Sequence, residues 1–163
     1  MGHGIAELLA LAGVEVTIVD INEELLKKAV ENITWSLGKF VERRRIREED
    51  AKAALERIKT NTNLEEAVVN ADLVVEAVPE VMELKKIIYK KLDEAAPGHA
   101  ILASNTSSLS ITEMAGQTGR PEKVVGMHFF NPPMIMALVE VVRGEETDDE
   151  TTDAIVKLVE KLG

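Results

Sequence analysis

The chain has 163 residues, enough for one domain with a sizeable core, and 45% of them are apolar. The formal net charge of −10 repels phosphate backbones, so we expect no nucleic-acid partner. No apolar run approaches the roughly 18–20 residues that cross a bilayer, so no membrane partner is expected either. The chain has no cysteine, which excludes disulfides and thiolate metal sites. We expect no metal, and a reducing compartment such as the cytoplasm.

Helical and strand patterns alternate along the chain. The first helix is expected near GIAELLALAG and ends at Gly13, and a β-branched strand follows at 14–19. The charged stretch from Glu23 to about Lys59 has helical periodicity, and we interpret it as a helical pair at about 22–59. Later helices are expected at 63–71, 81–96, 110–115 and 148–162, and strands at 72–78, 100–104, 123–129 and 137–142. This alternation predicts an α/β fold, doubly wound around a mainly parallel sheet.

Two residues near the start fit half of a dinucleotide site. Gly2 opens the first helix, as the last glycine of a G-x-G-x-x-G turn does, and Asp20 lies 18 positions later at the end of a strand. A carboxylate there accepts hydrogen bonds from the adenosine ribose and repels a 2′-phosphate, which favours NAD over NADP. The alternative is a chance turn and a helix cap.

Polar residues follow the strand at 100–104, in the sequence SNTSS. Ligands of parallel sheets bind beyond the carboxyl ends of the strands, which places Asn105, Thr106, Ser107 and Ser108 at such a site. These residues could instead cap the next helix, but Ser110, three residues before Glu113, already provides that cap.

A histidine and a glutamate lie on the last two predicted strands. His128 ends VVGMH, and Glu140 interrupts the apolar ALVEVV, where a lone carboxylate is costly unless it is paired. If the two side chains meet, the carboxylate would orient the imidazole for use as a base. The alternative is that His128 is an ordinary core residue.

Several motifs, in this order, resemble the 3-hydroxyacyl-CoA dehydrogenase family. They are MGHGIA, VVEAVPE, ASNTSSL, and HFFNPP followed by LVEVV. The resemblance covers almost the whole chain. It implies a Rossmann-type NAD-binding domain and NAD-dependent oxidation of L-3-hydroxyacyl-CoA to 3-ketoacyl-CoA in fatty-acid β-oxidation.

The resemblance also implies roles for individual residues. His128 would be the base, oriented by Glu140, while Ser107 would contact the substrate oxygen and Asn131 would line the site near the nicotinamide. The residues implied for NAD are Gly2, Asp20, Glu80, Lys85 and Asn105. Glu80 and Lys85 could instead be a solvated pair at the start of a helix.

The helical pair is where the family binds the CoA moiety. Ser36 and Arg43 fall on the matching positions, within a basic cluster completed by Arg44, Arg45 and Arg47. A CoA phosphate would suit such a cluster, although most charge runs are solvated helix faces.

Two parts of the family pattern are absent from the sequence. We expect the sheet to lack its first strand, together with the first two glycines, and we expect the C-terminal helical domain to be absent. That domain carries most of the dimer interface in the family, so the parent protein is expected to be a homodimer. We therefore predict that the isolated chain is poorly stable, binds NAD weakly and does not turn over.

Two other functions stay open. One is a related dehydrogenase that acts on a small hydroxyacid or sugar acid, as in the lambda-crystallin relatives. The other is a non-catalytic dinucleotide-binding or structural module, against which the joint presence of His128, Glu140, Ser107 and Asn131 argues.

Overall fold

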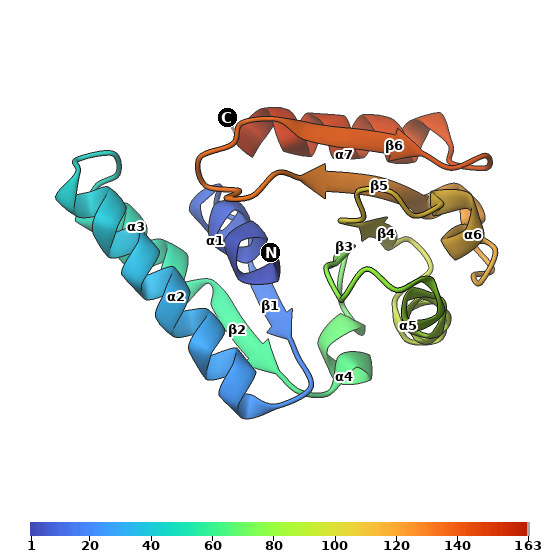
Figure 1. Ribbon diagram of the computed structural model, residues 1–163, viewed down its shortest axis with the longest axis horizontal. Coiled ribbons are helices and arrows are strands. Elements are labelled where there is room, and N and C mark those ends of the chain that lie inside the picture. Colours follow the sequence, from blue (N-terminus) through green and yellow to red (C-terminus); the bar gives the residue numbers. More distant parts are fainter. Residues whose placement is uncertain (163) are drawn as a thin grey trace. The chain divides into compact units, whose positions relative to one another are not determined.

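The computed structural model describes residues 1–162, and the chain divides into two compact units. The first unit is Met1–Leu64 with Asn131–Ile135 and Leu162, and the second is Glu65–Phe130 with Met136–Lys161. Figure 1 shows the elements coloured along the sequence.

The first unit combines three helices with two paired strands. Its elements are α1 (Gly2–Leu11), β1 (Val16–Val19), α2 (Glu23–Glu42), α3 (Glu48–Glu56) and β2 (Ile58–Asn61). Strands β1 and β2 are parallel, with Val16 opposite Ile58. Alanines on α1 and α3 allow these helices to pack closely with Ile33 and Leu37 of α2 in one buried cluster.

Both ends of α2 are specified by local hydrogen bonds. The Asn22 side chain accepts a bond of 2.9 Å from the Leu25 amide and caps the start. At the end, the amides of Arg44 and Arg45 donate to the carbonyls of Val41 and Phe40, both at 2.9 Å. This is the pattern of a Schellman motif. Arg44 has φ 55°, a conformation that glycine usually supplies, so an arginine is kept at a position that disfavours it.

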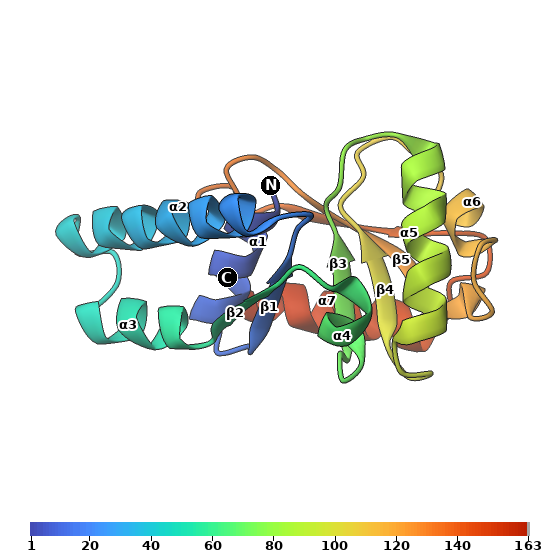
Figure 2. The same ribbon diagram turned by 90° about the horizontal axis from the view of Figure 1, so that it is seen from below.

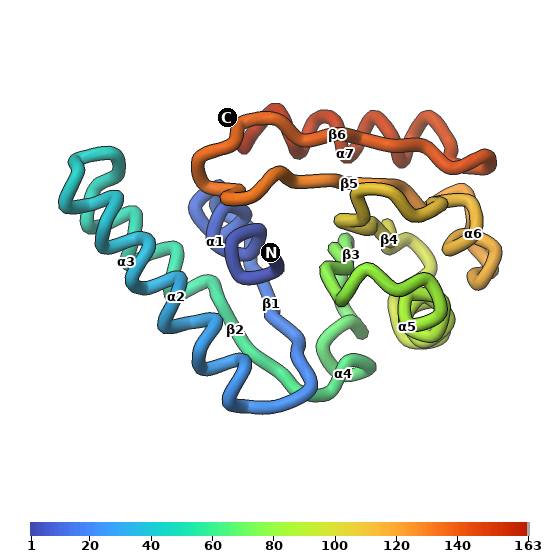
Figure 3. Tube along the Cα trace, viewed as in Figure 1, coloured from blue at the N-terminus to red at the C-terminus, as the bar shows by residue number. Residues whose placement is uncertain are grey.

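The second unit contains a four-stranded sheet of order β3-β4-β5-β6. Strands β3 (Leu73–Glu76), β4 (Ile101–Ser104) and β5 (Val124–Phe129) are parallel, and β6 (Val139–Arg143) is antiparallel to β5. Figure 3 shows the chain leaving β5 and returning as β6. The remaining elements are α4 (Leu64–Val68), α5 (Met82–Ala95), α6 (Ile111–Ala115), η1 (Pro121–Lys123) and α7 (Asp149–Leu162).

The core of the second unit lies around β4 and β5. Leu102 of β4 and Val125 and Met127 of β5 are fully buried. Figure 2 shows α5 running lengthwise beside β3 and β4, and its Tyr89 and Leu92 are buried as well. The centre of the sheet is therefore apolar, and polar residues lie where β3, β4 and β5 end.

The predicted α/β class with mainly parallel strands is confirmed. One element was predicted wrongly: Ile58–Asn61 is the strand β2, whereas helical periodicity was expected to continue to about Lys59. Among the described strands β2 pairs only with β1, and only its two end residues are partly buried. A strand with so little burial tolerates polar residues and lacks an apolar signature. The described strands also form two sheets, not one.

Candidate active site

His128 and Glu140 lie directly opposite each other on the antiparallel strands β5 and β6. His128 Nδ1 is 2.8 Å from Glu140 Oε2, which is a hydrogen bond. The His128 side chain is 16% exposed and that of Glu140 is 50% exposed. Glu140 thus faces solvent at the edge of the pair, unlike the buried carboxylate suggested by its apolar neighbours. The His128 ring is therefore mostly buried but not fully so, and its catalytic role stays a prediction.

This contact has a chemical consequence for the imidazole. A carboxylate accepts hydrogen bonds only, so the bond makes Nδ1 the proton-bearing nitrogen and leaves Nε2 with a free lone pair. Glu140 also stabilises the cation that forms when Nε2 takes a proton. The Phe130 ring packs against the imidazole, with ring centroids 4.7 Å apart, and restricts its rotation. The pair therefore has the geometry of an oriented base.

The loop after β4 is tied to both neighbouring strands. Asn105 Oδ1 accepts a bond of 2.8 Å from the Phe129 amide at the end of β5, and the Asn105 amide donates to the Glu76 carbonyl at the end of β3. Asn105 thus joins the carboxyl ends of three strands. Its predicted contact with NAD stays a prediction.

Ser110 caps α6 as predicted, because its hydroxyl group accepts a bond of 3.2 Å from the Glu113 amide. Thr106 also has a local role, since its hydroxyl oxygen accepts from the Leu109 amide at 2.9 Å. Ser107 and Ser108 are not needed for the cap, and the Ser107 side chain is exposed in the loop. Ser107 is therefore accessible to a ligand.

Glu80 and Lys85 are not a solvated pair. The Lys85 side chain is 1% exposed, and its Nζ lies 2.7 Å from Glu76 and 3.3 Å from Glu80. Glu80 is 39% exposed and also accepts hydrogen bonds from the Thr106 hydroxyl and the Ser107 amide. Burial raises the pKa of Glu80, but these bonds and Lys85 outweigh it and hold that pKa below its usual value. Glu80 is the more exposed of the two residues, and the predicted contacts of both with NAD stay predictions.

Glu76 was missed by sequence reasoning, although a signal was present. It interrupts the apolar strand DLVVEAV in the same way as Glu140 interrupts ALVEVV, and it is 4% exposed. The rule that a carboxylate in an apolar strand needs a partner applied to both.

The residues predicted for the adenosine half of NAD lie in the first unit. Gly2 is the first residue of α1, and Asp20 follows β1 directly. The Asp20 carboxylate is exposed, and one oxygen accepts a bond of 2.7 Å from the Ile21 amide. This placement suits an acidic residue that receives ribose hydroxyl groups.

Asn131 also belongs to the first unit, whereas the His128–Glu140 pair belongs to the second. Its neighbour Pro133 packs against Gly4, where an added Cβ would lie 3.1 Å from the proline Cδ. Gly4 is thus closely packed against Pro133, which the glycine pattern did not reveal. The role of Asn131 near the nicotinamide stays a prediction.

The basic cluster at the end of α2 is only partly free. Arg47 binds Asp50 through two hydrogen bonds of 2.8 and 2.9 Å. Arg43, Arg44 and Arg45 are exposed, and the described part of the chain shows no ion pair for them. Ser36 is half-buried on α2. It is the hydroxyl group that hydrogen-bonds to the buried Glu7 of α1 and opposes the shift of its pKa.

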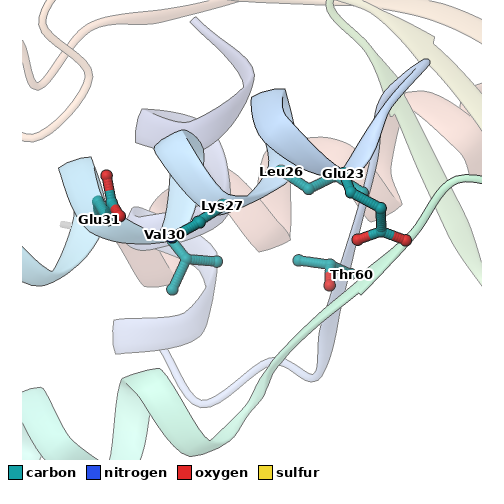
Figure 4. Close-up of a pocket in the computed structure, with 6 residues that line it drawn as sticks. All are labelled: Glu23, Leu26, Lys27, Val30, Glu31 and Thr60. Atoms are coloured by element: carbon teal, nitrogen blue, oxygen red, sulfur yellow. The ribbon is translucent and has the colours of Figure 1, made fainter.

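A hollow in the first unit lies between α2 and β2. Figure 4 shows the residues that line it, which are Glu23, Leu26, Lys27, Val30, Glu31 and Thr60. None of the residues predicted for NAD or CoA lies there, so no role is assigned to it. No cluster of possible metal ligands occurs in residues 1–162, and within the same range no helix is long and apolar enough to cross a membrane.

A family model described as "3-hydroxyacyl-CoA dehydrogenase, NAD binding domain" matches residues 1–163. The chain belongs to this family. NAD is the cofactor of the domain, as predicted from Asp20.

Named relatives agree with this assignment. The probable 3-hydroxybutyryl-CoA dehydrogenase of Bacillus subtilis is 44% identical over 163 residues, which are 100% of this chain and 56% of that protein. The human mitochondrial hydroxyacyl-coenzyme A dehydrogenase is 40% identical over 168 residues, covering 100% of this chain and 54% of that protein. The chain thus spans about half the length of these relatives.

Solved structures show the same fold. The crystal structure of 3-hydroxybutyryl-CoA dehydrogenase from Escherichia coli K12 superposes with a TM-score of 0.97 at 40% identity, covering 100% of this chain and 34% of that one. The corresponding enzyme from Ralstonia eutropha gives a TM-score of 0.96 at 41% identity, covering 100% of this chain and 57% of that one. The fold class of the domain is therefore that of the family.

Proposed function

We propose that this domain serves the NAD-dependent oxidation of L-3-hydroxyacyl-CoA to 3-ketoacyl-CoA, as a step of fatty-acid β-oxidation. The observation that carries the proposal is the hydrogen bond of 2.8 Å between His128 Nδ1 and Glu140. It leaves Nε2 as a proton acceptor, which the oxidation of an alcohol requires.

In the proposed reaction, His128 Nε2 takes the proton of the substrate hydroxyl group, and Glu140 stabilises the imidazolium cation. NAD, when bound, accepts the hydride that leaves the same carbon. The exposed Ser107 hydroxyl group donates a hydrogen bond to the substrate oxygen. Asn131 lines the site. In the reverse direction the imidazolium returns its proton to the ketone oxygen.

The donor set of the chain suits NAD. Asp20 is exposed at the end of β1, in position for the adenosine ribose, and Gly2 opens α1 without a side chain. In the second unit, Glu80 and Asn105 flank the loop that carries Ser107, and Lys85 supports Glu80 from inside. We assign these residues to the cofactor.

A CoA substrate is supported by charge. Arg43, Arg44 and Arg45 make no ion pair within residues 1–162 of this acidic chain, and Arg43 and Ser36 hold the positions implied by the family resemblance. Guanidinium groups bind phosphates strongly. The relatives from Bacillus, Escherichia and Ralstonia are named for a CoA ester.

The first test is titration of NADH fluorescence with this chain and with Asp20→Ala. We expect saturable binding that weakens in the variant. Glu24→Ala is the matched control, because it removes another exposed carboxylate from the same unit. Equal NADH affinity in all three proteins would refute the assigned cofactor site.

The second test measures oxidation of 3-hydroxybutyryl-CoA by a chimera in which residues 1–163 replace the matching part of the Bacillus relative. Turnover that is lost with His128→Gln is the expected result. A chimera that folds, binds NADH and oxidises only small hydroxyacids would favour the alternative dehydrogenase. NADH binding without any oxidation would favour the non-catalytic module.

Two further proposals concern the parent protein. We propose that it is cytoplasmic and forms a homodimer through the helical domain that the family resemblance implies. Cell fractionation and light scattering of the native protein test these proposals.

A further inference from the structure

Glu76 is a buried carboxylate at the end of β3 whose two oxygens are fully used. Oε1 accepts from Lys85 Nζ and from the Val78 amide, both at 2.7 Å. Oε2 accepts from the Ser104 hydroxyl group at 2.7 Å and from Lys85 Nζ at 2.9 Å. One side chain thus joins β3, the end of β4 and helix α5.

Lys85 connects Glu76 to Glu80. Its ammonium group contacts both carboxylates, at 2.7 and 3.3 Å, and is itself 1% exposed. A buried ammonium ion held between two carboxylates has little freedom to move. The position of Glu80 therefore depends on Glu76, although the two carboxylates face different surroundings.

Glu80 in turn holds the loop that carries Ser107. Its Oε1 accepts from the Ser107 amide at 3.1 Å and from the Thr106 hydroxyl group. Ser104, at the end of β4, also contacts this loop, since its hydroxyl oxygen accepts a hydrogen bond of 3.2 Å from the Thr106 amide. Both routes, through Lys85 and through Ser104, begin at Glu76.

We propose that Glu76 is a positioning residue, which acts through Lys85 and Ser104 to hold Glu80 and the loop 104–108 in the arrangement that binds NAD. The effect of Glu76 on NAD binding rests on the proposed function, whereas its effect on the loop does not. Lys85 then acts by holding Glu80 in place.

Stability alone is a weak reason for this arrangement. Buried ion pairs are often replaceable by apolar residues at no cost to stability, because desolvation offsets their attraction. A pair that also orients a partly exposed carboxylate and two loop residues has a further use, which is to fix geometry at a ligand site.

The test is amide hydrogen exchange, followed by NMR, in the full chain and in Glu76→Gln. We expect exchange at the Ser107 amide to become at least about tenfold faster. Without the Glu76 carboxylate Lys85 is no longer fixed, so Glu80 and the loop that it holds become more mobile. Exchange at Leu102, in the middle of β4, should change little. Lys86→Gln is the matched control, since it removes a cation from the next position of α5 that binds Glu83 and Glu113 instead.

A second variant guards against a failure to fold. The double change Glu76→Gln with Lys85→Gln removes both buried charges and keeps the size of both side chains. It should also speed exchange at Ser107. Unchanged exchange at Ser107, or a proportional rise at Ser107 and Leu102, would show a purely structural role and overturn the proposal.

NADH titration completes the test. The dissociation constant for NADH should rise in Glu76→Gln by about tenfold and stay unchanged in Lys86→Gln. A loosened loop with unchanged NADH affinity would overturn the link to the cofactor. If the wild-type chain binds no NADH, the proposed function fails for this chain, and the exchange at Ser107 still decides whether Glu76 positions the loop.

Discussion

Among the described residues each unit buries one carboxylate, and the surroundings of the two differ. Glu7 on α1 is 2% exposed, and its Oε1 has no hydrogen-bond partner among the described residues. Glu76 on β3 is 4% exposed and is bonded to an ammonium group, a hydroxyl group and a backbone amide. The same side chain thus has one hydroxyl partner in one unit and a network of charged and neutral donors in the other.

The difference shows what decides the charge of a buried acid. Burial raises the pKa of Glu7 to about 7, and only the Ser36 hydroxyl group opposes the shift. No charged group contributes to that shift. Glu76 has a cation and neutral donors for its charge. Glu7 is consequently a group that titrates near neutral pH, whereas Glu76 lies 2.7 Å from the Lys85 ammonium group.

The largest expected effect on stability comes from breaking the ion pair between Glu76 and Lys85. Lys85→Met leaves Glu76 buried without its cation, and the free energy of unfolding should fall by about 3–5 kcal/mol. Urea denaturation at pH 7 measures it. The double variant Glu76→Gln/Lys85→Gln should recover most of the loss. A loss below about 1 kcal/mol in Lys85→Met would show that the pair is not buried as described.

Glu7 should make stability depend on pH in the opposite sense to most carboxylates. Its ordinary pKa is 4.5 and its folded value is about 7. The unfolded chain therefore releases this proton first, and stability falls as pH rises from 4.5 to 7, then levels off. At pH 8 the cost is about 3 kcal/mol.

Glu7→Gln should abolish that slope, since the amide resembles the protonated acid. We expect the variant to be more stable than wild type at pH 8 and nearly equal at pH 4.5, measured by thermal unfolding at both values. Glu31→Gln, an exposed carboxylate on α2, is the control. Equal pH slopes in wild type and Glu7→Gln would contradict the assignment.

The His128–Glu140 pair, which is partly exposed, extends the comparison. Glu140→Gln should change the free energy of unfolding by less than about 1 kcal/mol, because half of its side chain is in water. Turnover by the chimera should nevertheless fall on the order of 10²-fold, since His128 loses its orienting carboxylate. Large destabilisation with unchanged turnover would make the pair structural.

The smallest expected effect concerns the free arginines. Arg43→Glu should raise KM for 3-hydroxybutyryl-CoA by about tenfold at low salt, and less at high salt, because charge attraction is screened. Arg47→Glu is the control, since Arg47 is already bound to Asp50. A small hydroxyacid substrate should be unaffected. Equal effects of both variants would remove the CoA role of Arg43.

The sequence predicted the elements that bear strong local signals. Ser110 caps α6, and the apolar strands β3 to β5 were placed within one or two residues. The strand β2 was missed because its character depends on pairing with β1 and not on its own residues. Burial of Lys85 was also unexpected, because the sequence around it has the pattern of a solvated helix start.

What the sequence determined by itself is the family, the α/β class, and the candidates His128, Glu140, Ser107 and Asp20, since these rest on local pattern and motif. Tertiary structure alone decided which charges are paired. The register of β5 with β6 brings His128 to Glu140, and the packing of α5 on β3 brings Lys85 to Glu76. Hydrogen bonds between residues distant in the chain depend on ångström-scale positions, which no local spacing specifies.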